Sequence, residues 1–359
     1  TWRGINSKGC DSIASLNLVI YNTSSSISST SCNSYSLNGY IVDSTGTYLY
    51  PDDFINHSTQ IGNTILGTSN NDNSGKVIDL SKDGNIVAIG SPFDDDFLFN
   101  SGSVKVFEYS GQDWLQKGSS IHGSSEDEEF GSSIALSYDG QVLAIGSMNS
   151  DLNGTNSGEV RVYLWNNNDY VLMGSIIGGD TVNEKFGSSV SLSENGLRLA
   201  VGSKNNSSNG LNSGQLKMYE WDGFNWTQMG SEINGQNNLD RFGFSVSLSS
   251  DGSIVASGAI YNDDGGANSG HVRVFNWDGT NWNQLGNNIN GESADDQSGY
   301  SISLSGNGER IIIGAPFNEG NDTLASNQNG HSRVYEFDGL AWNQLGSDID
   351  GVSLDSKCG

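Results

Sequence analysis

A repeat of about 56 residues dominates this chain of 359 residues and constrains its fold more than any other feature. The repeat begins five times at a fixed spacing, the difference between Phe186 and Phe130 being 56. Cys358-Gly359 stands where a sixth copy would begin, 60 residues after Ser298. A fixed period of this length indicates supersecondary units that stack or are arranged radially. The five starting dipeptides are Ser74-Gly75, Phe130-Gly131, Phe186-Gly187, Phe242-Gly243 and Ser298-Gly299.

One copy, residues 242–291, predicts four short strands joined by tight turns. The first, third and fourth strands alternate polar and apolar residues, whereas the second is a continuous apolar run that we expect to be buried on both faces. Asp251-Gly252 and Asp278-Gly279 are two-residue hairpin signals, because glycine accepts the positive φ that such turns need. Four antiparallel strands of this kind are typical of one β-propeller blade. The predicted strands are residues 245–249, 254–256, 270–277 and 282–286.

We therefore predict an all-β chain in which residues 58–359 form a β-propeller of five four-stranded blades, with six blades as the alternative. The tryptophans recur at fixed positions of the repeat, at the end of the third strand or the start of the fourth. This periodicity favours packing between blades over a row of exposed rings that stack on sugars. The tryptophans concerned are Trp114, Trp165, Trp221, Trp226, Trp277, Trp282 and Trp342.

The repeat reads FGxSVSLSxDGxxVAIGSP…SGxVRVYxWDG, which resembles the FG-GAP repeats of integrin α-type propellers and their bacterial surface-protein relatives. The resemblance covers residues 74–351 and implies a propeller in an extracellular protein. Calcium-binding members of that family carry an Asp-x-Asp-x-Asp-Gly loop. Here the first turn is only Ser-x-Asp-Gly or Ser-x-Asn-Gly, too short to surround a cation, so the calcium function of the family does not transfer to this turn.

Residues 1–57 do not follow the repeat. Two pieces, Gly9–Ile20 and Cys32–Tyr50, resemble the closing and opening halves of Ig-like repeats in secreted bacterial adhesins, but here the closing half comes first. The halves either fold together as one permuted β-sandwich or complete a domain with strands from another copy, because unpaired strand edges seek strands. An exchange of that kind, repeated head to tail, builds an open filament.

Gln60–Gly67 matches the end of the fourth strand of a repeat, so the chain holds six such ends but five sets of the other strands. The surplus strand would close the ring, belong to a sixth blade completed by Cys32–Tyr50, or dock on a neighbouring molecule.

Three cysteines lie outside the regular repeats, and their spacing matches no zinc or redox motif. The Ig-like resemblance implies a Cys10–Cys32 disulfide. Cys358 is then unpaired and is either a free thiol, half of a bridge to another molecule, or a small buried substitute for the phenylalanine that starts other repeats. Disulfides would place the protein outside the reducing cytosol, extracellular or at the cell surface.

The net charge is −26, from 16 Lys and Arg against 42 Asp and Glu. This balance argues against nucleic acid and anionic membranes as partners, and no apolar run is long enough to span a membrane. Seven Asn-x-Ser/Thr sequons make N-glycosylation possible in a secreted chain. The sequon asparagines are Asn22, Asn56, Asn153, Asn205, Asn206, Asn225 and Asn321.

No catalytic group emerges from the four histidines, because none has the spacing of a metal pair or a nucleophile motif. Acidic clusters are the stronger candidates for chemistry, since carboxylates with amide oxygens bind Ca²⁺ in extracellular modules, and Ca²⁺ is the one cofactor they suggest. Solvated surface charge is the simpler interpretation of each cluster. The calcium candidates are Asp94, Asp95, Asp96, Asp263 and Asp264, and further acidic runs between repeats are 126–129 and 295–296.

These observations predict a non-enzymatic extracellular structural or adhesive protein, a subunit of a surface fibre joined head to tail through N-terminal strands and terminal cysteines. Its partners would be other copies of itself, with glycans or surface proteins as further partners. A glycan-binding propeller is the alternative. A glycoside-active enzyme comes third, because it needs two inward carboxylates and the second strands near the axis are apolar or small.

Overall fold

The computed structural model describes residues 60–319, 329–351 and 356–359, and the strands β1–β7 before them. The chain divides into two compact units, Thr1–Ile61 and Gly62–Gly359. In the first unit β1 pairs with β2, β4 pairs with both β3 and β7, and β5 pairs with β6. The strands are β1 (Trp2–Ile5), β2 (Asp11–Ala14), β3 (Ile20–Tyr21), β4 (Ser24–Ser29), β5 (Tyr35–Leu37), β6 (Tyr40–Val42) and β7 (Gly46–Leu49).

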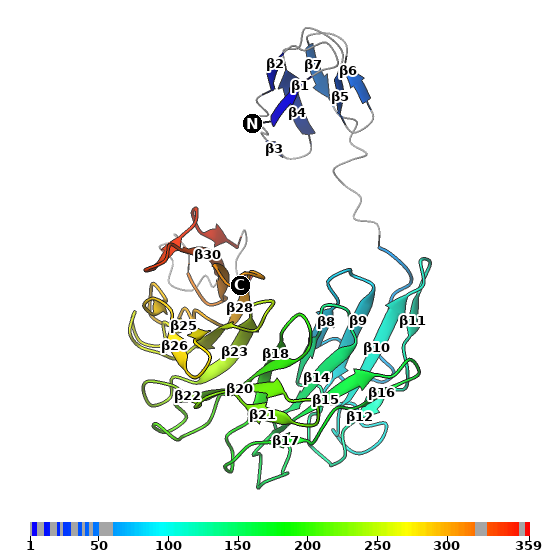
Figure 1. Cartoon of the computed structure of the whole chain (residues 1–359), viewed down its shortest axis with the longest axis vertical. Coiled ribbons are helices and arrows are strands. Elements are labelled where there is room, and N and C mark those ends of the chain that lie inside the picture. The colour runs from blue at the N-terminus through cyan, green and yellow to red at the C-terminus, as the bar shows by residue number, and fades with distance from the viewer. Residues whose placement is uncertain are drawn as a thin grey trace. The chain divides into compact units, whose positions relative to one another are not determined.

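The second unit consists of five antiparallel sheets, one for each repeat, and Figure 1 shows them following one another from cyan to red. The described residues contain no helix, and so none that could cross a membrane. The predicted all-β architecture of five four-stranded blades is confirmed. Blade 1 consists of β8 (Val77–Leu80), β9 (Ile86–Ser91), β10 (Ser103–Tyr109) and β11 (Trp114–Gln116), and blade 2 of β13 (Ser133–Leu136), β14 (Val142–Ser147), β15 (Glu159–Trp165) and β16 (Tyr170–Leu172). Blade 3 consists of β18 (Phe186–Leu192), β19 (Arg198–Ser203), β20 (Gln215–Trp221) and β21 (Trp226–Gln228), and blade 4 of β23 (Phe242–Leu248), β24 (Ile254–Ala259), β25 (His271–Trp277) and β26 (Trp282–Gln284). Blade 5 consists of β28 (Ser301–Leu304), β29 (Arg310–Ala315), β30 (His331–Phe337) and β31 (Trp342–Gln344).

The outer edge of each blade differs from the prediction, because the fourth strand is interrupted. In blade 4, β26 pairs with the far end of β25, and a separate two-residue strand, β27, pairs with the near end of β25. Gly286, in the gap between β26 and β27, has a φ of +73°, which a glycine adopts at little cost. The corresponding short strands are β12 (Ile121–His122), β17 (Ile177–Gly178), β22 (Ile233–Asn234), β27 (Ile289–Asn290) and β32 (Ile349–Asp350).

The turn between the first two strands of a blade is closed by its own side chains. In blade 4 the Ser249 hydroxyl donates to the Asp251 carboxylate (2.8 Å) and accepts from the Ile254 N–H (2.9 Å). The same Asp251 carboxylate accepts the Ser253 N–H (2.9 Å). The Ser-x-Asp-Gly sequence therefore forms a self-contained turn whose carboxylate is already occupied by hydrogen bonds.

Backbone hydrogen bonds join these turns from one blade to the next, and the row ties all five blades together. Each of the first four turns donates an N–H to the carbonyl of the following turn at 2.7–3.0 Å. The row runs from Lys82 to Tyr138, Glu194, Ser250 and Gly306.

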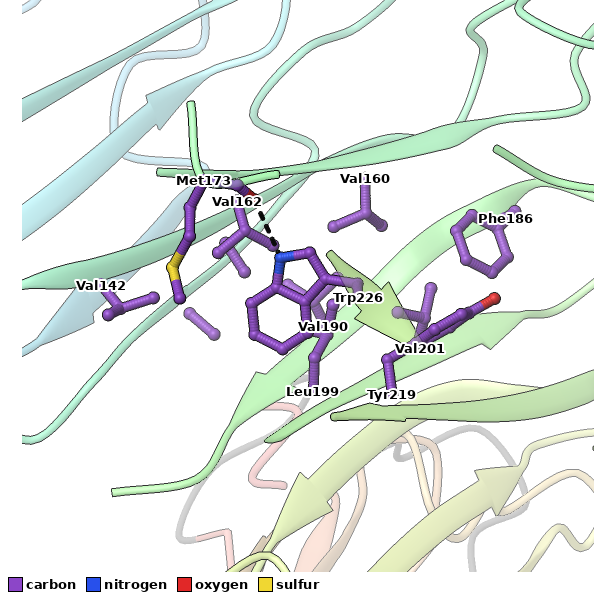
Figure 2. Packing of buried hydrophobic residues seen from close by; sticks show 12 residues of the cluster. Val142, Val160, Val162, Met173, Phe186, Val190, Leu199, Val201, Tyr219 and Trp226 are labelled. Atoms are coloured by element: carbon purple, nitrogen blue, oxygen red, sulfur yellow. Dashed lines mark hydrogen bonds between the residues drawn. The ribbon is translucent and has the colours of Figure 1, made fainter. Parts of the chain in front are cut away.

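Four hydrophobic clusters hold the blades together, and each spans two consecutive blades. Figure 2 shows the cluster between blades 2 and 3, where the Trp226 ring lies among Val142, Met173 and Leu199. Its Nε1–H donates to the Met173 carbonyl of the preceding blade at 3.0 Å. Trp282 and Trp342 repeat this contact with the blades before them. The prediction that most tryptophans pack between blades is confirmed.

Candidate functional site

The first blade has an open face. In blade 2, Ile134 and Leu136 of β13 are 7% and 8% exposed, because they pack against blade 1. The residues at the same positions of β8 are Ile78 and Leu80, and they are 63% and 53% exposed. The sequence pattern is the same in both strands, so the difference comes from the missing neighbour. The described residues place no blade against this face.

The fifth blade has an open face on its opposite side. Ile312, Leu345 and Ile349 are 39%, 46% and 52% exposed. At the equivalent positions of blade 4, Ala256 and Ile289 are 0% and 6% exposed, because they pack against blade 5. No buried cluster of the described residues joins blade 5 to blade 1. The second strands are accordingly buried on both faces in the interior blades, as predicted, but β29 exposes one face.

Asn63, within the predicted strand Gln60–Gly67, contacts blade 1 as the last piece of a preceding blade would. Asn63 donates its backbone N–H and its side-chain amide to the Asp113 carboxylate, at 2.8 and 2.6 Å. The Ser119 N–H makes the equivalent bond to Asp169 one repeat later. The prediction of a strand at Gln60–Gly67 is nevertheless wrong: none forms there, because the third strand with which it would pair is absent from the described residues.

Cys358-Gly359 begins a sixth copy in structure as well as in sequence. The Cys358 N–H donates to the Asn329 carbonyl at 2.9 Å, as the Phe242 N–H does to Ser213 in blade 4. The Cys358 thiol is free and half-buried. Cys358 thus occupies the place of the repeat-starting phenylalanine. Cys10 and Cys32 lie outside the described residues.

The calcium candidates are not gathered into one site. Asp94 is fully buried and accepts hydrogen bonds from the Ser103 hydroxyl (2.9 Å) and the Asp96 N–H (3.0 Å). Asp95 and Asp96 are exposed beside it in blade 1. Asp263 and Asp264 are exposed in blade 4, and the Asp263 carboxylate accepts the Asn268 N–H of its own loop (2.8 Å). The two groups therefore lie in different blades, and the carboxylates of Asp94 and Asp263 are already occupied by local hydrogen bonds.

A buried carboxylate two residues before every repeat start is a feature that the sequence analysis missed. Asp240 is 2% exposed and accepts the Asn237 N–H (2.9 Å) and the Asn262 side-chain amide (3.2 Å). Burial raises its pKa, although these two hydrogen bonds oppose the shift. The recurrence of Asp or Glu at this position was the available signal. The acidic runs 126–129 and 295–296 each contain one of these carboxylates, which are Asp72, Glu128, Glu184, Asp240 and Asp296.

The third strand of each blade carries a basic residue, which the sequence analysis also missed. Arg161 is 7% exposed, pairs with Glu128 at 2.6 Å and lies over the Phe130 ring, 5.0 Å from its centroid. Through these contacts Arg161 holds the segment between the first two repeats, which contains Glu128 and Phe130, against blade 2. The set consists of Lys105, Arg161, Lys217, Arg273 and Arg333.

The histidines lie in separate places. His271 and His331 are buried at the same position of β25 and β30, and burial lowers the pKa of each. His122 lies in β12, 5.9 Å from the Phe97 ring. Glu292 and Asp348 approach His331, but the Arg333 guanidinium already pairs with Glu292 at 2.9 Å. His57 lies outside the described residues.

The sequons divide by exposure. Asn153 and Asn225 are exposed, and Asn205 is half-buried. Asn206 is 2% exposed, and its amide donates to Glu184 (2.8 Å) and Gln215 (3.3 Å), so the folded chain cannot carry a glycan there. Asn206 is therefore removed from the glycosylation candidates. Asn22, Asn56 and Asn321 lie outside the described residues.

A shallow cavity of about 440 Å³ opens where the turns of blades 2, 3 and 4 meet. Asp139 accepts the Ser137 hydroxyl at 2.7 Å within its own turn. Burial raises the pKa of Asp251, but hydrogen bonds from Ser253 and Ser249 and the nearby Arg198 outweigh it and leave the pKa lowered. A general acid needs a raised pKa, so Asp251 is poorly suited to that role in glycoside hydrolysis. The cavity is lined by Tyr138, Asp139, Glu194, Asn195, Ser250 and Asp251.

Comparisons with known proteins agree with this architecture. A family model described as the FG-GAP repeat matches residues 234–275. No curated protein matches the chain. Among solved structures, the hydrazine synthase of Kuenenia stuttgartiensis is similar with a TM-score of 0.50 and 15% identity, covering 81% of this chain and 72% of that chain. At this identity the likeness concerns the fold alone. The chain therefore carries an FG-GAP repeat within a fold of the β-propeller type.

Proposed function

We propose that this chain is a non-enzymatic extracellular structural or adhesive protein, a subunit of a surface fibre that assembles head to tail. The observation that supports the proposal most is the pair of open faces on blades 1 and 5. They are different surfaces, one presented by Ile78 and Leu80 and the other by Ile312, Leu345 and Ile349. Contacts between unlike faces extend into an open filament unless the rotation closes a ring.

The chain already carries the two ends of an additional blade. Cys358-Gly359 makes the first contacts of such a blade on blade 5, and Gln60–Gly67 makes the last contacts on blade 1. Among the described residues, no three inner strands complete this blade. We propose that strands from residues 1–57 of another copy fill this space, because strand addition satisfies both backbone hydrogen bonds and apolar faces.

An extracellular location fits this proposal, because FG-GAP repeats are typical of extracellular proteins. Oxidising surroundings would allow the proposed Cys10–Cys32 disulfide to form. They would also allow Cys358, whose thiol is free, to bridge two copies. The net charge of −26 keeps assembled subunits soluble by mutual repulsion along their exposed surfaces.

Electron microscopy in negative stain, with light scattering to measure mass, tests the assembly. The full chain should form fibres, and the Ile78→Asp, Leu80→Asp variant should give single particles. A matched control replaces Phe224 and Leu211, which are 84% and 63% exposed on blade 3, and should still form fibres. Discrete monomers of the unmodified chain at all concentrations would refute the proposal, and would favour a chain whose own N-terminal strands fill the space.

A further inference from the structure

One end of the blade array gathers cations and aromatic rings. This is the end where the repeats start and where the second strands finish, opposite the turns that line the shallow cavity. Lys185 and Arg241 directly precede repeat starts, and Lys204 follows β19. Lys357 directly precedes Cys358. Such a group is unexpected in a chain with 16 Lys and Arg against 42 Asp and Glu.

Three rings form a continuous row across blades 4 and 5. The centroids of Phe244 and Tyr300 are 5.0 Å apart, and those of Tyr300 and Phe317 are 6.1 Å apart. Tyr300 is 42% exposed, in the middle of the row. The Lys204 ammonium lies 5.6 Å from the Phe244 centroid, and that of Lys357 lies 5.2 Å from the Phe317 centroid. The row is therefore flanked by positive charge at both ends.

In the described part of the chain no carboxylate lies within 4 Å of the cations near this row, although Glu129 acts on Lys185 and Lys204 at longer range, and Asp151 on Lys185. The Lys204 ammonium contacts the Met148 sulfur at 3.6 Å, and the Lys185 ammonium donates to the amide oxygens of Asn149 and Asn156 at 2.5 and 2.8 Å. Burial lowers the pKa of Lys204, and so do the charges of Arg241, Lys185 and Lys76. In the described part of the chain, the ion pairs within 4 Å involve none of Lys185, Lys204, Arg241 and Lys357.

We propose that this surface binds an acidic saccharide. The faces of the ring row accept the apolar face of a sugar ring, and Lys204 beside Phe244, with Arg241 whose charge acts on Lys204, pairs with a carboxylate or sulfate group on it. A long nucleic acid is disfavoured, because a protein of net charge −26 repels an extended polyanion while a local cluster still holds one or two anionic groups. The inference rests on the proposed adhesive function and names its ligand. Lys357 adjoins Cys358 and therefore the proposed assembly contact, so the variants that test the inference are made at Lys204, Arg241 and Tyr300.

Titration calorimetry of the full chain at physiological salt tests the inference, with three hexasaccharides as probes: a sulfated one, a uronate one and a neutral one. The sulfated or the uronate probe should bind, and which of them binds identifies the anionic group. Lys204→Gln with Arg241→Gln should weaken binding about tenfold for each lost charge-assisted contact. Tyr300→Ala should weaken it as well, while Lys204→Arg retains most of the affinity.

Lys82→Gln is the matched control, because Lys82 lies over the Tyr138 ring at the opposite end of the array, 4.5 Å from its centroid. Its affinity should equal that of the unmodified chain. Circular dichroism of each variant checks the fold, and light scattering separates the two proposals: loss of saccharide binding with unchanged assembly concerns this surface alone. The inference fails if no acidic probe binds, if the neutral probe binds equally well, or if the Lys204 and Arg241 changes leave the affinity unaltered.

Discussion

Acidification should destabilise the propeller through His271. The imidazole is fully buried in β25, and burial lowers its pKa to about 4 from an ordinary value of 6.5. The neighbouring Arg273 charge acts in the same direction, and Asp264 opposes it. The Asp264 carboxylate is 3.7 Å from Nδ1, too far for a hydrogen bond that would hold the charged form.

The sign and size of this pH effect on stability follow from the difference in proton binding between the folded and the unfolded chain. Between pH 6.5 and about pH 4 the unfolded chain binds a proton at this histidine and the folded chain does not, so the free energy of unfolding falls as the pH drops. The full effect is roughly 3 kcal/mol, of which roughly 2 kcal/mol is lost by pH 5. Half-buried Asp79 and buried Asp240 have raised pKa values, mainly through burial, and they act in the opposite direction. A variant must therefore isolate the histidine.

His271→Gln is the matched variant, because Gln215 occupies the same position in blade 3 and donates to Asn234 at 2.9 Å. Asn290 pairs with His271 in the register as Asn234 pairs with Gln215. Urea denaturation at pH 7 and pH 5 should show the unmodified chain losing roughly 2 kcal/mol more than the variant. Equal losses in the two proteins would refute the reasoning.

Three further changes test the packing described above. Phe242→Ala should cost about 3–5 kcal/mol in urea denaturation, because the ring is fully buried between blades 3 and 4; a loss below about 1 kcal/mol would contradict that packing. Trp226→Phe should cost about 1–3 kcal/mol by leaving the Met173 carbonyl without its donor, and an unchanged melting temperature would argue against the bond. Gly214→Ala should destabilise far more than Gly223→Ala: both have positive φ, but a Cβ at Gly214 would lie 2.0 Å from the Phe242 carbonyl oxygen, whereas one at Gly223 meets nothing within 4 Å. Similar melting temperatures for the two glycine variants would contradict this.

The blades could be predicted from sequence because their signals are local and repeated. Asp251-Gly252 marks a turn in any protein, and the apolar run that starts at Ile254 has the length and composition of a buried strand. Their recurrence at a fixed period adds the evidence that the same unit is built five times. The interrupted fourth strand was missed, because Trp282–Gly286 alone does not show that Ile289 returns to the same partner strand.

The open faces could not be read from the sequence, because Ile78 and Leu80 follow the same pattern as Ile134 and Leu136. Only the tertiary arrangement decides which pair is covered. The buried carboxylates were hidden for another reason: the partner of Asp240 is Asn262, but its counterpart in blade 2 is Ser150 and in blade 1 is Asp94. Because the residue at the partner position changes from blade to blade, the sequence does not show that the buried carboxylate has the same role in each.

The cationic and aromatic surface was missed because its members come from different repeats. Phe244 and Tyr300 hold the position that Ser132 and Ser188 hold in blades 2 and 3. Variation between repeats normally indicates tolerated surface positions. Here the variation gives blades 4 and 5 aromatic rings at a position where blades 2 and 3 have serine.

The row of hydrogen-bonded turns has a consequence for how the molecule comes apart. Each interior blade is held by a neighbour on both sides, whereas blades 1 and 5 each have one apolar face that no blade of the described residues covers. When each unit gains stability from its nearest neighbours, opening begins at the ends, as in a zipper. Hydrogen exchange should be slowest in blade 3 and fastest in blades 1 and 5. Any partner that covers the two end faces would therefore slow the opening of the whole array, although it makes no contact with the middle blades.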